Sequence, residues 1–383
     1  MATIGIDVTA LSTPASGGIG TSQYQTMLAL AALDTPHRFI MYAAQPPLVP
    51  FTDRPLDVDW PLRLGRGITA RSNILWMQTG ANRLLAEDRI DLVWSPRHLL
   101  PLRARSVAKV ATIQDFWHLH YPEQQPLVNR TLNAHLIGRI LRDADHIVTT
   151  SQATADDAFA HYHVAPERLT VVPLGVDASA FKAAPAERID DVRGRLGLVR
   201  PYLLSLDVFN PRKNFDTVLT AFAGLPASVR AGLDVVGVGR RRATASGSDP
   251  LTVATALGIA GHVRVLDDVG FGDLVALYSG ALAFVYPSVY EGFGMPVLEA
   301  MACGVPVITS NRSSLPEVAG DAAILVDPES PQELALAIAR MVGDPTAAAS
   351  LAERGAVRAG EFTWRRTAEG MLAVFDSSLG RRR

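Results

Sequence analysis

The sequence predicts an α/β protein made of two domains, each with a parallel β-sheet between layers of helices. The chain has 383 residues, which is enough for two domains that each bury a core of their own. Short apolar runs, typical of buried parallel strands, alternate with helical patterns in both halves of the chain. Several of these runs end in Gly-rich turns that lead into a helix, and open parallel sheets bind their ligands at such turns.

The predicted boundaries divide the chain into two domains, a linker and a terminal helix. Residues 1–180 are expected to form the N-terminal domain and residues 198–362 the C-terminal domain. A polar, Ala-rich stretch at 181–197 is the predicted linker. Residues 363–383 carry the pattern of a terminal helix.

Composition and charge exclude several classes of protein. The formal net charge is −2 and 48% of the residues are hydrophobic, which argues against a disordered or nucleic-acid-binding chain. The single cysteine, Cys303, excludes an internal disulfide and fits a reducing compartment. The sequence has no signal-peptide pattern and no 18-residue apolar run. We therefore expect a cytoplasmic protein that at most lies on the surface of the cytoplasmic membrane.

One region of the N-terminal half carries an excess of positive charge. Between Arg54 and Lys109 there are ten basic and five acidic side chains. Two interpretations stay open: a face for an anionic acceptor or a membrane, and an ordinary solvated surface.

Strands and helices alternate along the N-terminal half. The expected strands are Thr3–Val8, Phe39–Tyr42, Asp91–Trp94, Val107–Ile113, Ile147–Thr150 and Leu169–Val172. The expected helices between them include Asn73–Glu87 and Val128–Asp143.

A Gly-rich turn, SGGIGTS at residues 16–22, follows the first predicted strand. It lacks the third glycine and the distant acidic residue of the dinucleotide-binding fingerprint. We therefore expect Gly18 and Gly20 to line the ligand cleft without holding a dinucleotide.

The segment TIQDFWHLHYPE at residues 112–123 follows another predicted strand and gathers polar and aromatic side chains at the same sheet edge. Gln114 can hydrogen-bond a hydroxyl group but cannot titrate near neutral pH. Asp115 is expected either to hold the backbone of this loop or to touch a substrate. His118 and His120 are candidates for binding an acceptor molecule, with a structural role as the alternative.

The C-terminal half repeats the alternation. Its expected strands are Tyr202–Leu206, Leu233–Val238, Val263–Leu266, Ala283–Tyr286, Val305–Thr309 and Ile324–Val326. Its expected helices include Asp273–Tyr278, Pro331–Val342, Ala347–Phe362 and Trp364–Leu379. Glycines at 237 and 239 suggest a close approach of the backbone to the cleft, and Asp267 and Asp268 are candidates for framing a nucleotide base.

Two basic residues, Arg212 and Lys213, precede a helix in the segment DVFNPRKNFDTVLTAF. Positive charge at a helix start opposes the helix dipole, so this placement is unfavourable unless an anion lies above it. A diphosphate would neutralise both charges, whereas a pair of basic residues in an exposed loop is the alternative.

The stretch PSVYEGFGMPVLEAMACGVPVIT at residues 287–309 indicates the end of a strand, a Gly-rich loop and the start of a helix. Glycines at 292 and 294 let the backbone bend, and Pro296 suits the first helical turn. Such a helix start presents N–H groups and positive potential to an anion, for example a phosphate. Glu291 and Glu299 flank it, and carboxylates beside a phosphate need hydroxyl partners, so the residues favour a nucleotide sugar as the ligand.

These motifs resemble those of a known enzyme family. The run EGFGMPVLEAMACGVPVIT, with Glu291 and Glu299 eight residues apart, and SSLPEVAGDAAILVDP at residues 313–328 are similar to the signature of retaining glycosyltransferases of family 4. The resemblance implies the GT-B fold, in which two Rossmann-like domains face each other across a cleft. It also implies an N-terminal acceptor domain, a C-terminal nucleotide-sugar domain, and a terminal helix that crosses back to the first domain.

The resemblance also implies roles for individual residues. Arg212 and Lys213 would stabilise the leaving diphosphate in place of a metal ion, helped by backbone N–H groups at Gly294 and Met295. Glu291 would hold the hydroxyls of the donor sugar and Glu299 those of the ribose. The full predicted donor site is Gly18, Gly20, Arg212, Lys213, Glu291, Gly292, Phe293, Gly294, Met295, Pro296 and Glu299.

The family usually has a His–Asp pair where this chain has Gln114 and Asp115. We count both residues as catalytic candidates together with Arg212, Lys213 and Glu291. His118 or His120 could take over part of the role of the missing histidine.

The run SVYEGFGMPVLEAMACGVPVITSNRSSLPEVAGDAA looks most like bacterial mannosyltransferases of O-antigen and exopolysaccharide assembly. The resemblance implies transfer of mannose from GDP-mannose to a glycan or lipid-linked glycan, with retention and with no cofactor or essential metal. Because no side chain is well placed to be a covalent nucleophile, we expect the acceptor to attack on the face from which the diphosphate leaves. The alternatives are a UDP-sugar donor, a nucleotide-sugar epimerase and a non-catalytic nucleotide-sugar-binding protein. We expect Glu291→Ala and Lys213→Ala each to abolish transfer and to leave the fold intact.

Overall fold

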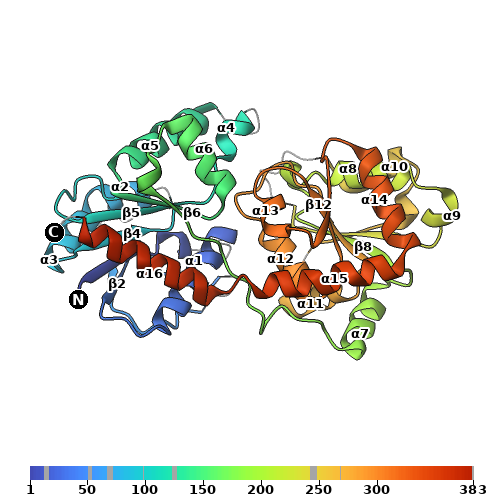
Figure 1. The fold of residues 1–383 in the computed structure, drawn as a ribbon, viewed down its shortest axis with the longest axis horizontal. Coiled ribbons are helices and arrows are strands. Elements are labelled where there is room, and N and C mark those ends of the chain that lie inside the picture. Colours follow the sequence, from blue (N-terminus) through green and yellow to red (C-terminus); the bar gives the residue numbers. More distant parts are fainter. Residues whose placement is uncertain are drawn as a thin grey trace. The chain divides into compact units, whose positions relative to one another are not determined.

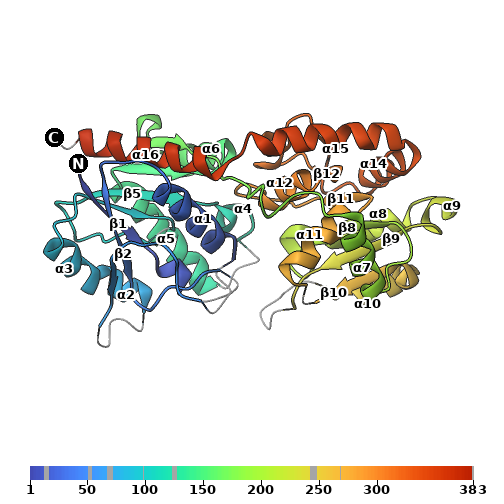
Figure 2. The same ribbon diagram turned by 90° about the horizontal axis from the view of Figure 1, so that it is seen from below.

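The structure, a computed structural model, describes residues 1–12, 17–50, 54–66, 72–97, 99–122, 127–241, 248–267 and 269–381. The chain forms two compact units. The first comprises Met1–Gly175 together with Thr363–Arg383, and the second comprises Val176–Phe362. Each unit has its own sheet with helices packed around it (Figures 1 and 2). Two parallel sheets confirm the predicted α/β class.

The first unit contains a seven-stranded parallel sheet with the order β3-β2-β1-β4-β5-β6-β7. Its strands are β1 Thr3–Asp7, β2 Arg38–Ala43, β3 Leu62–Leu64, β4 Leu92–Ser95, β5 Ala108–Ile113, β6 His146–Thr149 and β7 Leu169–Val171. Its helices are η1 Thr9–Leu11, α1 Gly17–Ala31, α2 Asn73–Gln78, α3 Gly80–Glu87, α4 Trp117–His120, α5 Leu127–Asp143, α6 Gln152–Tyr162, η4 Pro166–Arg168 and α16 Trp364–Gly380. The edge strand β3 is missing from the sequence prediction because it has only three residues and both of its leucines are exposed, so it lacks the apolar run of a buried strand.

The two faces of this sheet bury different side chains because neighbouring residues of a strand point to opposite sides. Ile4 and Ile6 of β1 pack with α1 and α16 in one apolar cluster. Gly5, between them, faces Leu85 of α3 on the other side. Helix α16 is the last helix of the chain, yet its Phe375 is fully buried and lies 5.8 Å from the ring of Trp94 in β4.

The second unit contains a six-stranded parallel sheet with the order β10-β9-β8-β11-β12-β13. Its strands are β8 Tyr202–Leu206, β9 Asp234–Val238, β10 Val263–Leu266, β11 Ala283–Tyr286, β12 Val307–Ser310 and β13 Ala323–Val326. Its helices are α7 Ala186–Leu196, η5 Pro211–Lys213, α8 Phe215–Ala223, α9 Ala227–Arg230, α10 Pro250–Ala256, η6 Ala260–His262, α11 Phe271–Ser279, α12 Met295–Ala302, α13 Leu315–Ala319, α14 Pro331–Gly343 and α15 Pro345–Gly360.

This strand order creates a switch point between β8 and β11. From β8 the chain builds outward to β10, then returns to the middle and builds the other side from β11 to β13. The loops that follow β8 and β11 therefore leave the same edge of the sheet side by side, which is where open α/β sheets bind ligands. Arg212 and Lys213 follow β8, and Glu291 follows β11.

The predicted linker at 181–197 contains a helix and belongs to the second unit. Helix α7 buries Val192, and Arg188 and Arg195 both pair with Asp273 of α11. Ala-rich, polar composition suggested a linker, but the buried side chain and the paired charges hold this segment as an element of the domain.

The Gly-rich segment after β1 is helical where a turn was expected. Helix α1 starts at Gly17, which has a φ of +65° and so takes a conformation that favours glycine. Gly18 and Gly20 belong to the first turns of this helix, and Gly20 is buried. Ser16 lies outside the described residues.

Glycines at 237 and 239 are explained by packing inside the second unit. A Cβ atom on Gly237 would lie 2.9 Å from Val208 Cγ1, and one on Gly239 would lie 2.8 Å from the backbone nitrogen of Val208. The loop after β8 therefore passes too close to the end of β9 for any side chain there. Asp268 and Arg242 lie outside the described residues.

None of the helices in the described ranges combines the length and the apolar content that crossing a lipid bilayer requires.

Candidate functional site

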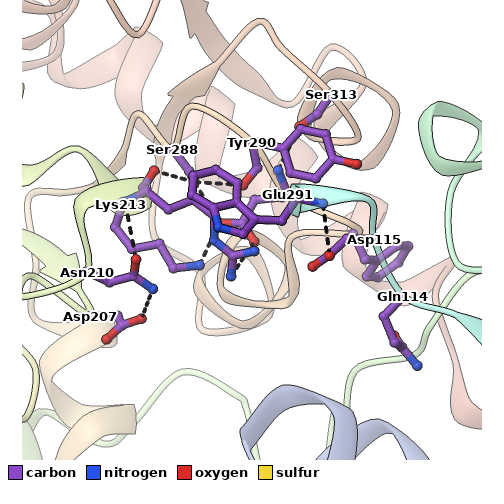
Figure 3. Close-up of polar contacts among 12 residues, drawn as sticks. Gln114, Asp115, Asp207, Asn210, Lys213, Ser288, Tyr290, Glu291 and Ser313 are labelled. Atoms are coloured by element: carbon purple, nitrogen blue, oxygen red, sulfur yellow. Dashed lines mark hydrogen bonds and ion pairs between the residues drawn. The ribbon is translucent and has the colours of Figure 1, made fainter. Parts of the chain in front are cut away.

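The loops after β8 and β11 bring together a buried ion pair. Lys213 Nζ donates a hydrogen bond to Glu291 Oε1 at 2.6 Å, and both side chains are less than 10% exposed. Arg212 Nη2 lies 3.8 Å from Glu291 Oε2. The structure therefore joins three of the predicted catalytic residues in one cluster, which Figure 3 shows for Lys213 and Glu291.

Local backbone geometry positions Arg212 and Lys213 beside Glu291. The side chain of Asn210 accepts a hydrogen bond from the backbone N–H of Arg212 at 3.2 Å and so caps η5. Asn214 then turns the chain with a φ of +59°, a conformation that asparagine tolerates. Its side-chain amide donates to the carbonyl oxygens of Pro287 and Pro328, at 3.3 and 2.6 Å. These bonds tie the loop after β8 to the loops after β11 and β13.

Glu291 is held as a carboxylate by several donors. Ser288 Oγ donates to its Oε1 at 2.7 Å and Tyr286 OH at 3.0 Å, in addition to Lys213. Burial alone would raise the pKa of Glu291, but the cations of Lys213 and Arg212 and these hydrogen bonds lower it to about 2. Glu291 is therefore ionised at neutral pH. Burial lowers the pKa of Lys213, and the Glu291 carboxylate acts against that shift.

The sequence did not reveal the residues that position Glu291. Tyr286 ends β11, and Ser288 follows it in the loop. Ser313, which has a φ of +52°, accepts a hydrogen bond from the backbone N–H of Glu291 at 2.9 Å (Figure 3). Ser314 Oγ lies 2.9 and 2.8 Å from the carbonyl oxygens of Glu291 and Phe293 and can donate its proton to either. The only sequence signal was the match of SSLPEVAGDAA to the family pattern, which does not say what these hydroxyls contact.

Helix α12 starts directly after this loop. Gly294 precedes it with a φ of +106°, and a Cβ atom there would lie 2.7 Å from Leu315 Cδ2. Pro296 stands in the first turn, as predicted. The first N–H groups of a helix have no acceptor within the helix, so the start of α12, with Gly294 and Met295, is suited to bind an anion. Gly292 and Phe293 are buried in the loop that leads to it.

Glu299 lies one turn further along α12. Tyr278 OH donates a hydrogen bond to its Oε2 at 3.1 Å. Burial raises the pKa of Glu299 to about 7, and this single hydrogen bond offsets only part of the effect. Glu291 and Glu299 therefore differ in charge state: the first is ionised at pH 7, and the raised pKa of the second favours its protonated form near neutral pH.

Gln114 and Asp115 lie in the first unit, in the loop after β5. The Gln114 side chain donates to the carbonyl oxygen of Pro96 at 3.3 Å. Asp115 Oδ1 accepts from the backbone N–H of Trp117 at 3.2 Å (Figure 3). Asp115 therefore has the backbone-holding role that was one of its two alternatives, and its contact with a substrate stays a prediction.

His118 and His120 both contact helix α6. His118 is buried, its Nε2 lies 2.9 Å from Tyr162 OH, and burial lowers its pKa. His120 Nε2 lies 2.8 Å from Asp157 Oδ2. Their binding of an acceptor stays a prediction, as does the relation of Gly18 and Gly20 to the donor residues, which belong to the other unit.

Comparison with known proteins identifies the family of this chain. Residues 190–358 match the family model described as "Glycosyl transferases group 1", and residues 16–180 match the model "Glycosyltransferase Family 4". The chain is 31% identical over 279 residues to O-antigen chain mannosyltransferase B of Escherichia coli, with 72% of each protein covered. It is 33% identical over 263 residues to the MMP alpha-(1->4)-mannosyltransferase of Mycolicibacterium hassiacum, which covers 67% of this chain and 60% of that relative.

The fold is also similar to that of a solved structure. Sucrose-phosphate synthase from Thermosynechococcus elongatus superposes with a TM-score of 0.75 over the whole of both chains, at 21% sequence identity. Two family models that each match one unit, and a relative matched over 72% of its length, show the family. The chain is a hexosyltransferase with the GT-B fold and belongs to the group 1, family 4 glycosyltransferases.

Proposed function

We propose that this enzyme transfers mannose from GDP-mannose to a hydroxyl group of a glycan or lipid-linked glycan, with retention at the anomeric carbon and without a catalytic metal ion. The observation that carries the proposal is the Arg212–Lys213–Glu291 cluster beside the start of α12. The cluster and the helix start together supply positive charge, helix N–H groups and a fixed carboxylate at one edge of the sheet. A nucleoside diphosphate sugar has complementary chemistry in each of its parts.

The charge of the cluster suits a leaving diphosphate. Two cations and one carboxylate leave a net charge of about +1, and the N-terminus of α12 adds a partial charge of about +0.5. As the bond between the anomeric carbon and the phosphate oxygen breaks, negative charge grows on the diphosphate, and fixed positive groups stabilise it. In other phosphate sites a divalent cation has this task.

Glu291 has two tasks in this mechanism. Its Oε1 holds Lys213 in place, while Oε2 faces the Arg212 side chain and is the oxygen proposed to accept the donor sugar's hydroxyls. Glu299 is proposed to accept the hydroxyls of the ribose. Hydrogen bonds from the ribose hydroxyls would favour the ionised form of Glu299 and so offset the rise in its pKa that burial causes.

Retention follows if the acceptor attacks from the side on which the diphosphate leaves. The acceptor oxygen forms a bond to the anomeric carbon, the bond to the phosphate oxygen breaks, and the acceptor's proton passes to that phosphate oxygen. No side chain of the cluster is proposed as a covalent nucleophile, because Glu291 is engaged by Lys213, Ser288 and Tyr286. The two relatives named mannosyltransferases support mannose as the transferred sugar.

The test is a ligand panel followed by turnover. GDP, UDP, ADP and their common sugar conjugates are added to the purified enzyme, and the melting temperature is recorded. A ligand present at one hundred times its dissociation constant adds about 2.7 kcal/mol of stability, which is readily measured. We expect stabilisation by GDP and GDP-mannose alone, release of GDP with a mannosylated acceptor, and no rise in rate when Mg²⁺ is added to EDTA-treated enzyme.

Three other outcomes would contradict part or all of this proposal. Stabilisation by UDP sugars would replace GDP-mannose by a UDP donor and leave the site assignment in place. Binding of a nucleotide sugar with no transfer to any glycan would support an epimerase or a non-catalytic binder. No shift with any nucleotide would contradict the donor site itself.

A further inference from the structure

A second polar cluster lies in the first unit, where α4 meets α6 (Figure 1). His120 is the last residue of α4, and Asp157 and His161 stand one helical turn apart on α6. One ligand atom from each side chain can be chosen so that all three lie within 4.8 Å of one another. His120 Nε2 is 2.8 Å from Asp157 Oδ2, and His161 Nε2 is 3.9 Å from Asp157 Oδ1.

We propose that His120, Asp157 and His161 bind one divalent transition-metal ion, with Zn²⁺ as the best match. Two imidazoles and one carboxylate form a ligand set that suits zinc and its neighbours and that does not suit Mg²⁺ or Ca²⁺. Three protein ligands leave the fourth position of a tetrahedral ion for water.

The spacing of the three groups fits such an ion. Bonds of about 2.0–2.2 Å in tetrahedral geometry place neighbouring ligand atoms about 3.3–3.5 Å apart. The separations of 2.8 Å to Oδ2 and 3.9 Å to Oδ1, and the 4.8 Å within which one ligand atom from each of the three side chains lies, are near this value, so modest rotations of the side chains would close the site.

Exposure also fits a site that an ion can enter. The side chain of Asp157 is 16% exposed and is anchored between the helices, whereas those of His120 and His161 are 35% and 48% exposed. One side of the cluster is therefore open to solvent. His161 and Asp157 share one face of α6 because they are four residues apart, so α6 presents two of the ligands without any change in its backbone.

The ion would fasten a short helix. Helix α4 has only four residues, and it directly follows the loop of Gln114 and Asp115. Two residues of this segment already contact α6: His118 of α4 lies 2.9 Å from Tyr162 OH, and the ring of Phe116, just before α4, stacks on that of Tyr162 at 5.3 Å. A metal bridge from His120 to α6 would fix the far end of the same segment. This role is structural and separate from the donor residues, which belong to the second unit.

The experiment is a metal titration of the full-length, tag-free protein after chelation. Isothermal titration calorimetry with Zn²⁺, and the visible absorption of Co²⁺ as a probe of tetrahedral coordination, are measured for the wild type, His161→Ala and Asp157→Asn. The matched control is His135→Ala, which removes an exposed histidine from α5. Circular dichroism verifies that all variants are folded.

We expect one ion per chain in the wild type and in the control. Loss of one ligand should weaken binding at least tenfold and abolish the Co²⁺ band, and acid should weaken binding because protons compete for the imidazoles. Zn²⁺ should raise the melting temperature of the wild type and of His135→Ala but not that of His161→Ala. Absence of saturable binding in the wild type, or equal affinity in His161→Ala and His135→Ala, would overturn the proposal and leave the cluster as an ion-pair network.

Discussion

At the scale of single residues, the Lys213–Glu291 pair combines stability with function. Both charges are buried, and each is the main compensation for the burial of the other. Removing one member of a buried pair costs about 3–5 kcal/mol because it leaves an uncompensated charge. The structure therefore changes one expectation from the sequence, which was that Ala at either position would spare the fold.

Lys213→Ala and Glu291→Ala are predicted to abolish transfer and also to lower stability by about 3–5 kcal/mol at pH 7. Urea unfolding and a transfer assay on the same samples give both quantities. Arg83→Ala is the control, because it breaks an exposed pair with Glu87 and should change stability by less than about 1 kcal/mol. Full activity in either site variant would refute the assignment of the site.

Glu299 makes stability depend on pH in a defined direction. Its pKa is 4.5 in the unfolded reference and about 7 in the folded protein, so the folded protein binds more protons between these values. Stability therefore falls as pH rises from about 4.5 to 7. Glu299→Gln removes this titration. The free energy of unfolding of the variant, relative to that of the wild type, should therefore rise by about 2–3 kcal/mol between pH 4.5 and pH 8.

Thermal and urea unfolding of both proteins across this pH range measure the difference. A difference between wild type and Glu299→Gln that does not change with pH would show that folding does not raise the pKa of Glu299. If the ribose hydroxyls bind Glu299, GDP should also release more protons near pH 7 from the wild type than from the variant. Calorimetry in buffers of different ionisation enthalpy detects this release.

At the scale of elements, α16 completes the core of the first unit. Its Met371, Val374 and Phe375 are buried in the same cluster as β1 and β4. Gly175 lies so close to the start of this helix that a Cβ atom would stand 2.2 Å from the backbone nitrogen of Trp364. The last helix is thus a structural part of the first unit.

Phe375→Ala is predicted to destabilise the protein by about 3–5 kcal/mol, because it removes a fully buried ring and leaves a cavity. Phe159→Ala is the matched control: this ring, on α6 of the same unit, is 57% exposed, and its loss should cost less than about 0.5 kcal/mol. Urea denaturation of the two variants gives the comparison. Similar costs would mean that α16 does not pack as described.

At the scale of the whole molecule, the chain consists of two units with separate cores. The apolar clusters around β1, β4 and α16 and those around β8, β11 and α14 share no residue. The Arg212–Lys213–Glu291 cluster lies entirely in the second unit. A ligand of the proposed donor site should therefore stabilise the second unit, whereas a mutation in the core of the first unit should destabilise the first unit.

Differential scanning calorimetry is predicted to resolve two unfolding transitions. A nucleotide that binds the donor site should raise one of them, since binding stabilises the unit that holds the ligand. Phe375→Ala should lower the other. A single transition that moves equally in both experiments would show that the two units unfold as one.

Much of the fold could be read from the sequence because its signals are local. Buried parallel strands such as Ala283–Tyr286 are short apolar runs, and the helix start at Met295 is marked by Gly294 and Pro296. The dependence on local signals also produced two wrong predictions. Composition alone suggested a linker where α7 packs on α11, and glycines alone suggested a turn where α1 begins.

The sequence by itself determined the fold class, the family and the basic and acidic residues of the proposed donor site, because strand periodicity and motif spacing need no distant partner. Only the tertiary structure decided which of these residues meet. Lys213 and Glu291 are 78 positions apart, and they form a pair because β8 and β11 are neighbours at the switch point of the sheet. His120 and Asp157, 37 positions apart, meet because α4 lies beside α6. Such contacts depend on the order of strands and the packing of helices, which no local pattern encodes.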